Sequence, residues 1–111
     1  MNSNQKGKRF EREIAKIINK KFDSDVRRTP CSGGLSFKGD IIDLCGPLKE
    51  FHFECKNQEK MNIWDALRQA EGDAPGAKTP LVVFTKNFED TYVALRLNDL
   101  LDLIKEIQDL K

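Results

Sequence analysis

Glu54 and Lys56 carry opposite charges two positions apart and alternate with the apolar residues Phe53 and Cys55. If this segment is a strand, Glu54 and Lys56 share one face, and the apolar residues share the other. A carboxylate can hold Mg²⁺ through its oxygens, and a neighbouring ammonium can position a water or stabilise developing charge. The pair therefore suggests metal-dependent cleavage of a phosphodiester. Alternating charge on an exposed strand face is also common, so this pair alone does not establish a metal site.

Two aspartates upstream could supply a second carboxylate to such a site. Asp40 follows Gly39 at the expected start of a strand, where a carboxylate can reach a cleft. Asp43 lies nearer the turn signal at Gly46 and Pro47, and a hydrogen-bonding role at that turn is the simpler interpretation. The spacing favours Asp40 as the ligand without excluding Asp43.

The first helical segment offers two more acids, Glu11 and Glu13. Its apolar stripe is formed by Phe10, Ile14, Ile17, Ile18 and Phe22. Glu11 lies roughly 55° from the centre of that stripe and Glu13 roughly 105°, at 100° per residue. Glu11 is thus expected at the border of the buried face, and Glu13 is expected to point outward. Glu11 could reach a site made by the strands, or could be a solvated acid paired with Lys8 or Lys16.

His52 would share the face of Glu54 and Lys56 on the same strand. It could act as a general base or bind phosphate. A polar residue on an open face is the simpler expectation. The three cysteines, Cys31, Cys45 and Cys55, have no close-spaced pair and are expected to be reduced.

The net charge of +1 hides an asymmetry along the chain. Residues 1–38 contain ten basic and four acidic residues and carry +6, whereas the remainder carries −5. A basic segment suits a phosphate backbone, although a solvated helix face would have the same composition. The candidate phosphate-binding residues are Lys6, Lys8, Arg9, Arg12, Arg27, Arg28 and Lys38.

Hydrophobic periodicity and turn residues predict a single domain over residues 1–111, with residues 1–5 disordered. The expected helices are residues 6–22, 62–73 and about 98–110, and the expected strands are residues 26–29, 37–44, 49–56, 80–85 and 91–97. The strands at 37–44 and 49–56 would form a hairpin, and the strand at 80–85 would be covered on both faces. This order indicates an α/β fold, in which a mixed sheet is flanked by helices.

The last helix carries an apolar stripe that could pack in one of two ways. Its members are Leu100, Leu103, Ile104, Ile107 and Leu110. Packing against the chain's own sheet is expected, and dimerisation is the alternative. No apolar run approaches the roughly 20 residues of a membrane span, and the N-terminal residues do not resemble a signal peptide. A cytoplasmic protein, in a host cell if viral, is therefore expected.

Taken in order, these segments resemble the PD-(D/E)XK nuclease superfamily, most closely its archaeal-type Holliday-junction resolvases or a phage-encoded relative. Residues 6–13 are similar to the opening helix of that family, in which the catalytic glutamate falls four residues after a glycine, here Gly7 and Glu11. Residues 39–42 take the place of the Pro-Asp motif, with glycine in place of proline, and residues 53–56 take that of the (D/E)XK motif. Arg28 and Ser32 match an arginine and a serine near the scissile DNA.

The resemblance covers residues 6 to about 60 and implies a restriction-endonuclease-like fold. It implies that Mg²⁺ or Mn²⁺ is bound by Asp40, Glu54 and the backbone carbonyl of Cys55, with Glu11 completing the site. Lys56 would orient the attacking water, and Ser32 would join the catalytic residues. The implied reaction is DNA hydrolysis by paired nicks in a four-way junction, carried out by a homodimer.

Two alternatives remain open from the sequence. Gln69 resembles a glutamine found in other nucleases of the superfamily, and the last helix does not map onto the archaeal enzymes. The glutamine favours a phage or restriction-type nuclease that acts on flaps, nicks or duplex DNA. The other alternative is a non-catalytic DNA-binding module, in which the acids are structural.

Overall fold

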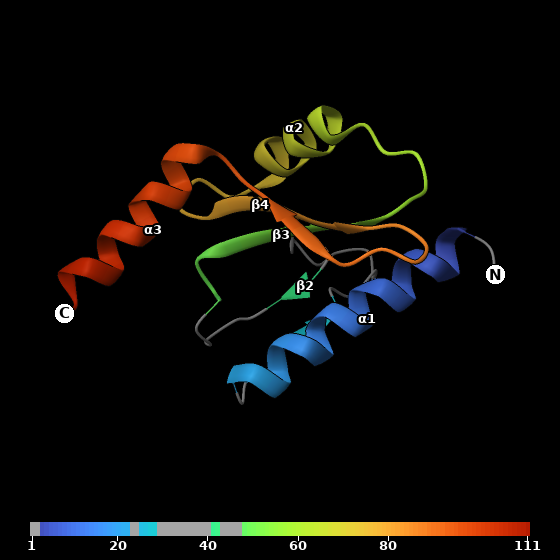
Figure 1. Ribbon diagram of the computed structural model, residues 1–111, viewed down its shortest axis with the longest axis horizontal. Helices are drawn as coiled ribbons and strands as arrows, with labels where there is room; N and C mark the ends of the chain where they lie inside the picture. The colour runs from blue at the N-terminus through green and yellow to red at the C-terminus, as the bar shows by residue number, and fades with distance from the viewer. Residues whose placement is uncertain (1–2, 23–24, 29–40, 43–47) are drawn as a thin grey trace.

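The computed structural model describes residues 3–22, 25–28, 41–42 and 48–111, and Figure 1 shows how their elements are arranged. The described residues form three helices and five strands. They are α1 (Ser3–Phe22), β1 (Arg27–Arg28), β2 (Ile41–Ile42), β3 (Phe51–Asn57), α2 (Ile63–Asp73), β4 (Thr79–Thr85), β5 (Tyr92–Ala94) and α3 (Leu97–Asp109).

Strands β3, β4 and β5 form a mixed sheet with β4 in the centre. β3 and β4 run parallel, so that Phe51 lies opposite Thr79 and Asn57 opposite Thr85. β5 pairs antiparallel with β4, and β1 and β2 form a separate antiparallel pair. Helices α1 and α2 lie on opposite faces of the sheet (Figure 1). The predicted α/β class, with a mixed sheet flanked by helices, is confirmed.

The core has two parts, one on each face of the sheet. On the α1 face the buried residues are Phe10, Ile14, Ala15, Val26, Ile41, Phe53, Leu81 and Val83, and on the α2 face they are Ala66, Ala70 and Val82. Consecutive residues of β4 thus contribute to both parts, because side chains alternate across a strand. The prediction that this strand is covered on both faces is confirmed.

Helix α2 begins where its capping residue predicts. The Asn62 side chain accepts hydrogen bonds from the backbone N–H groups of Trp64 and Asp65, as an N-cap residue does. Ala66 and Ala70 are the buried residues of this helix. Small side chains here let α2 approach the sheet closely. Trp64, in the first turn of the helix, is 68% exposed.

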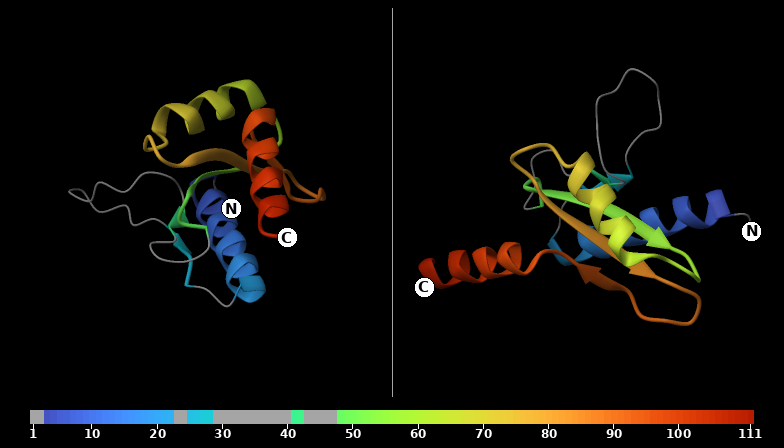
Figure 2. Two further views of the ribbon diagram at one scale, coloured as in Figure 1. Left: turned by 90° about the vertical axis from the view of Figure 1, so that its left-hand side faces the viewer. Right: turned by 90° about the horizontal axis from the view of Figure 1, so that it is seen from above.

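Helix α3 differs from α1 and α2 because it has no buried residue. It projects beyond the end of the sheet (Figures 1 and 2). Only Leu95 and Arg96 separate it from β5, and Arg96 donates a hydrogen bond to Glu71 on α2. This hydrogen bond and the charge of Glu71 raise the pKa of Arg96. The expectation that the apolar stripe packs on the chain's own sheet is wrong, because this short connection directs α3 away from the sheet.

Several boundaries differ from the sequence prediction. α1 begins at Ser3, so the described residues among the first five are helical rather than disordered. β5 is shorter than expected. The predicted hairpin falls largely outside the described residues, among which β2 pairs with β1 and β3 pairs with β4. Within the described segments, no helix is both long and apolar enough to cross a membrane.

Candidate functional site

Strand β3 places His52, Glu54 and Lys56 on the face of the sheet that α2 covers. Phe53, between them, belongs to the core on the α1 face. Glu54 lies opposite Val82 in the parallel register, and Val82 packs with the buried alanines of α2. The predicted alternation of Glu54 and Lys56 with Phe53 is therefore confirmed.

Glu54 and His52 form a buried polar pair. His52 is 2% exposed and Glu54 is 4% exposed. His52 Nε2 lies 3.2 Å from Glu54 Oε1, a distance at which the ring N–H can donate to the carboxylate. Burying a carboxylate is costly unless it is hydrogen-bonded, so His52 compensates part of that cost. The expectation of an open face at His52 is wrong, because β3 is covered on both faces at this point.

Lys56 lies farther along the strand, where the sheet meets solvent. Its side chain is half-buried, and its Nζ donates a hydrogen bond to Gln69 Oε1 at 2.9 Å. Gln69 is exposed on α2, so the bond links the strand to the helix. Lys56 and Gln69 line an open pocket together with Asn62 and Asp65. The ammonium is therefore accessible, whereas the carboxylate of Glu54 is fixed in the interior.

The two acids of α1 lie as the helical-face argument predicts. Glu11 is half-buried, whereas Glu13 is exposed and bonded to Arg9 at 3.1 Å. α1 covers the face of the sheet opposite to that of Glu54. Among the described residues, no group of three or more His, Cys, Asp or Glu side chains could hold a metal ion. The participation of Glu11 in a metal site stays a prediction.

Several predicted site residues lie outside the described part of the chain. These are Ser32, Lys38 and Asp40. Arg27 and Arg28 form β1, but only their backbone is described. Cys55 is half-buried, and the role of its backbone carbonyl as a metal ligand stays a prediction.

A polar pocket lies where the start of α1 meets the end of β3. It is lined by Lys6, Phe10, Arg9, Glu13, Asn57 and Asn87. The side-chain oxygen Oδ1 of Asn57 is buried there and has no hydrogen-bond partner among the described residues. Lys8 and Arg12 lie on the same helix, half-buried and exposed respectively. The N-terminal half of α1 thus presents positive charge beside the end of the strand that carries Glu54 and Lys56.

A mixed sheet between two helices, with an acid and a lysine two residues apart on one of its strands, fits the PD-(D/E)XK class of nucleases. A family model described as "Phage putative PDDEXK endonuclease" matches residues 2–110. The chain belongs to this family, and its fold is restriction-endonuclease-like. Comparisons with curated proteins and with solved structures gave no match.

Nucleases of this superfamily typically use divalent metal ions. The chemistry of the described donors fits such an ion in one respect: Glu54 offers a fixed carboxylate, and Mg²⁺ prefers hard oxygen ligands. Its Oε1 lies 3.2 Å from His52 Nε2, a contact that keeps the carboxylate in place.

The sequence places His52 on the face of Glu54, but it does not predict that the two side chains are buried and paired. The signal was the position of His52 two residues before Glu54, which puts both side chains on one face of a strand. His52 and Glu54 are buried together because α2, which is remote in sequence, covers this face of the strand. Gln69 accepts a hydrogen bond from Lys56, which gives this residue a physical role in addition to its resemblance.

Proposed function

We propose that this protein is a Mg²⁺-dependent DNA endonuclease that resolves four-way junctions by paired nicks. The observation that carries the proposal is the arrangement on β3, where a buried, hydrogen-bonded carboxylate precedes an accessible lysine by two residues. Membership in a phage endonuclease family supports the cleavage chemistry. The preference for junctions rests on the resemblance of the N-terminal motifs and on the basic N-terminal third.

Each residue of the site has a distinct task in this proposal. Glu54, Asp40 and the backbone carbonyl of Cys55 would hold Mg²⁺ or Mn²⁺, with Glu11 completing the site directly or through water. When bound, the ion would supply Lewis acidity and a more acidic water. Lys56 would orient the attacking water and stabilise the charge that develops on the phosphate. His52 would keep Glu54 in one rotamer, and Gln69 would hold Lys56 at the site.

The DNA backbone would be bound by positive charge at the start of the chain. The residues proposed for these contacts are Lys6, Lys8, Arg9, Arg12, Arg27, Arg28 and Lys38, with Ser32 near the scissile phosphate. Such contacts do not read bases, and they make affinity strongly dependent on salt. We propose that the protein acts in the cytoplasm, in that of the host cell if the chain is phage-encoded.

A panel of DNA substrates tests the proposal. Four-way junctions, flaps, nicked duplex and plain duplex are incubated with the protein at fixed salt, with Mg²⁺ or with EDTA. We expect two symmetric nicks in the junction, only with Mg²⁺. Preferred cleavage of flaps, nicks or duplex would favour the phage or restriction-type alternative. Binding that is indifferent to Mg²⁺, with no cleavage of any DNA, would support the non-catalytic module.

Paired nicks require two sites, and we propose that the active form is a homodimer in which α3 of each copy packs on the other. The apolar face of α3 includes Leu97, Leu100, Leu101, Ile104 and Ile107, each at least 42% exposed. The α1 face of the sheet has an apolar groove of about 510 Å³ lined by Ile14, Ile17, Phe22, Phe51 and Val93 among others. An apolar helix face and an apolar groove suit one another.

Two further observations support exchange between copies rather than closure within one. The start of α3 is bonded to α2, on the face of the sheet opposite to the groove. α3 carries four acids and one lysine, whereas α1 carries seven basic residues and two acids. The acids of α3 lie opposite its apolar stripe, so charge would steer the approach of two copies rather than form direct contacts.

Sedimentation of the full chain tests the exchanged dimer. We expect a dimer for the unchanged protein and monomers for both Ile104→Asp on the helix and Ile17→Asp in the groove. Asp102→Asn, on the polar face of α3, is the matched control and should stay dimeric. Mixing the two monomeric variants should restore some dimer, because one helix and one groove remain intact. A dimer that persists in Ile17→Asp would contradict the helix-in-groove arrangement.

A further inference from the structure

The connection between β4 and β5 holds an aromatic residue in an unusual state. Phe88 has a φ of 68°, and among the described residues it is the one non-glycine with positive φ. A side chain with a Cβ is disfavoured in this left-handed region, more so when it is bulky. Its side chain is also 105% exposed, the highest exposure among the large hydrophobic residues described. Neither backbone preference nor packing explains a phenylalanine at this position.

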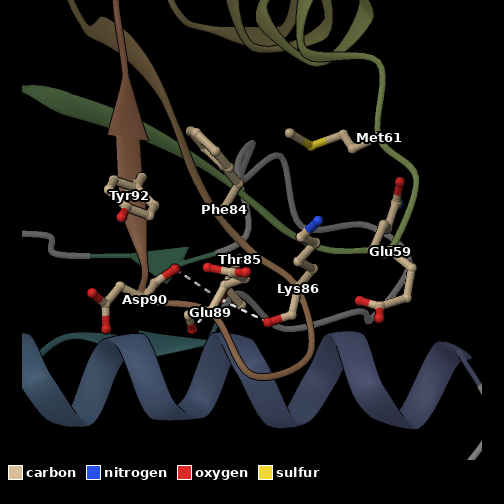
Figure 3. A pocket seen from close by; sticks show the side chains of 9 residues that line it. Glu59, Met61, Phe84, Thr85, Lys86, Glu89, Asp90 and Tyr92 are labelled. Atoms are coloured by element: carbon tan, nitrogen blue, oxygen red, sulfur yellow. Dashed lines mark hydrogen bonds between the residues drawn. The ribbon is translucent and has the colours of Figure 1, made fainter.

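The loop around Phe88 is nevertheless well fixed. The Thr85 hydroxyl lies 3.0 Å from the backbone carbonyls of Glu89 and Asp90, as the dashed lines in Figure 3 indicate. The Glu89 N–H donates to the Lys86 carbonyl at 3.1 Å, and the Asn87 N–H donates to the Glu59 carboxylate at 2.7 Å. These bonds span both sides of Phe88. The ring is therefore presented by a preorganised turn and not by a loose loop.

The turn lies at the same end of the sheet as Lys56. In the parallel register Lys56 is opposite Phe84, and Asn57 is opposite Thr85, so the turn begins directly beyond the strand end next to Lys56. Asn87 lines the polar pocket together with Lys6 and Arg9 of α1. Figure 1 shows the β4–β5 connection beside the N-terminal half of α1. An exposed aromatic ring is thus flanked by positive charge and by the strand that carries the site.

We propose that Phe88 is a wedge that stacks on an unpaired or partly unstacked base at a branch point in the DNA. The inference rests on the proposed nuclease function and adds a residue that selects branched over continuous DNA. Aromatic rings stack on bases irrespective of sequence, and apolar wedges enter base steps where stacking is already weak. A branch point offers such a step, whereas a continuous duplex must first be opened. The rigid turn holds the ring in an exposed position, so little backbone conformational entropy is lost on binding.

Binding to junction DNA in Ca²⁺, with 2-aminopurine next to the branch point, tests this role. The variant is Phe88→Asn, because asparagine tolerates positive φ and lacks the ring. We expect its affinity for the junction to fall about tenfold, in line with the loss of one stacked base. Its affinity for plain duplex should be unchanged. The 2-aminopurine signal should change when unchanged protein binds, and this change should be lost in the variant.

Lys86→Ala is the matched control on the same turn. It should weaken binding to junction and duplex alike and lower the salt dependence, as loss of a phosphate contact does.

Equal junction affinity for Phe88→Asn and unchanged protein would overturn the wedge. So would equal losses on junction and duplex, or a change of oligomeric state in Phe88→Asn, which would mark a protein contact. If the unchanged protein cuts DNA and Phe88→Asn selects branched DNA equally well, only the wedge fails. If the unchanged protein cuts no DNA, the nuclease proposal itself fails.

Discussion

Strand β3 contributes to two polar pairs that have very different surroundings. His52 and Glu54 are both buried and bond to each other within the strand. Lys56 is half-buried and bonds to Gln69, which is exposed on α2. The inner pair is thus shielded from water, and the outer pair is open to it.

Because of this difference in burial, we expect the two pairs to have different roles. A buried carboxylate held by a hydrogen bond keeps one geometry, which suits a ligand that must be preorganised. An accessible ammonium can approach a phosphate or a water, at the cost of greater mobility. We therefore expect changes in the inner pair to affect metal binding and folding, and changes in the outer pair to affect mainly the chemical step.

Glu54→Gln should have the largest effect on cleavage. The amide keeps the shape of the side chain and a hydrogen-bonding atom for His52, but it removes the negative charge. We expect the single-turnover rate to fall at least about a thousandfold, because metal-assisted stabilisation of charge contributes several kcal/mol. DNA affinity in Ca²⁺ should change little. An active Glu54→Gln would place the essential carboxylate elsewhere.

Lys56→Met should have the second-largest effect on cleavage. Methionine retains much of the aliphatic length but cannot donate to a water or a phosphate oxygen. A loss of about a hundredfold or more in the single-turnover rate is expected, as for loss of one donor aimed at developing charge. Thermal unfolding should be nearly unchanged, since the Lys56–Gln69 bond lies at the surface. A variant that unfolds early would mean that Lys56 is structural.

His52→Leu should reveal the inner pair through stability and metal affinity. Leucine leaves Glu54 without its buried partner, which should lower the free energy of unfolding by about 1–3 kcal/mol in urea titrations. Binding of Mg²⁺ measured by calorimetry should also weaken, because the carboxylate is no longer held in one rotamer. His52→Gln can still donate to Glu54 and should recover most of the metal affinity. Equal metal affinity in all three proteins would limit His52 to a role in folding.

Gln69→Ala should have the smallest effect. The hydrogen bond to Lys56 is at the surface, so its loss is expected to reduce the cleavage rate only about fivefold, or roughly 1 kcal/mol. Gln69→Glu, which can also accept from Lys56, is the companion variant and should remain closer to the unchanged protein. A loss as large as that of Lys56→Met would show that Gln69 contacts the DNA itself.

Local patterns in the sequence predicted the elements that local physics determines. Asn62 begins α2 where a capping residue should, and the continuous apolar run at Leu81, Val82 and Val83 became a strand buried on both faces. The placement of Glu11 and Glu13 on α1 also followed from helical geometry alone. In each case the information lies within a few residues of the feature.

Contacts between distant segments were not predictable in the same way. His52 is buried because α2 covers β3, and the residues next to His52 in the sequence do not predict this contact. α3 has a clear apolar stripe, yet its direction depends on a short connection and on the bond between Arg96 and Glu71. Trp64 is exposed, because the small residues Ala66 and Ala70 provide the contact between α2 and the sheet.

Cleavage of a labelled four-way junction by the unchanged protein and by Glu54→Gln, prepared in the same way, tests the central claim most directly. With Mg²⁺ we expect paired nicks from the unchanged protein, and none when EDTA replaces the metal. Glu54→Gln should bind the junction and leave it intact. Equal cleavage by both proteins, or cleavage that persists in EDTA, would contradict a metal-dependent site built on Glu54 and Lys56.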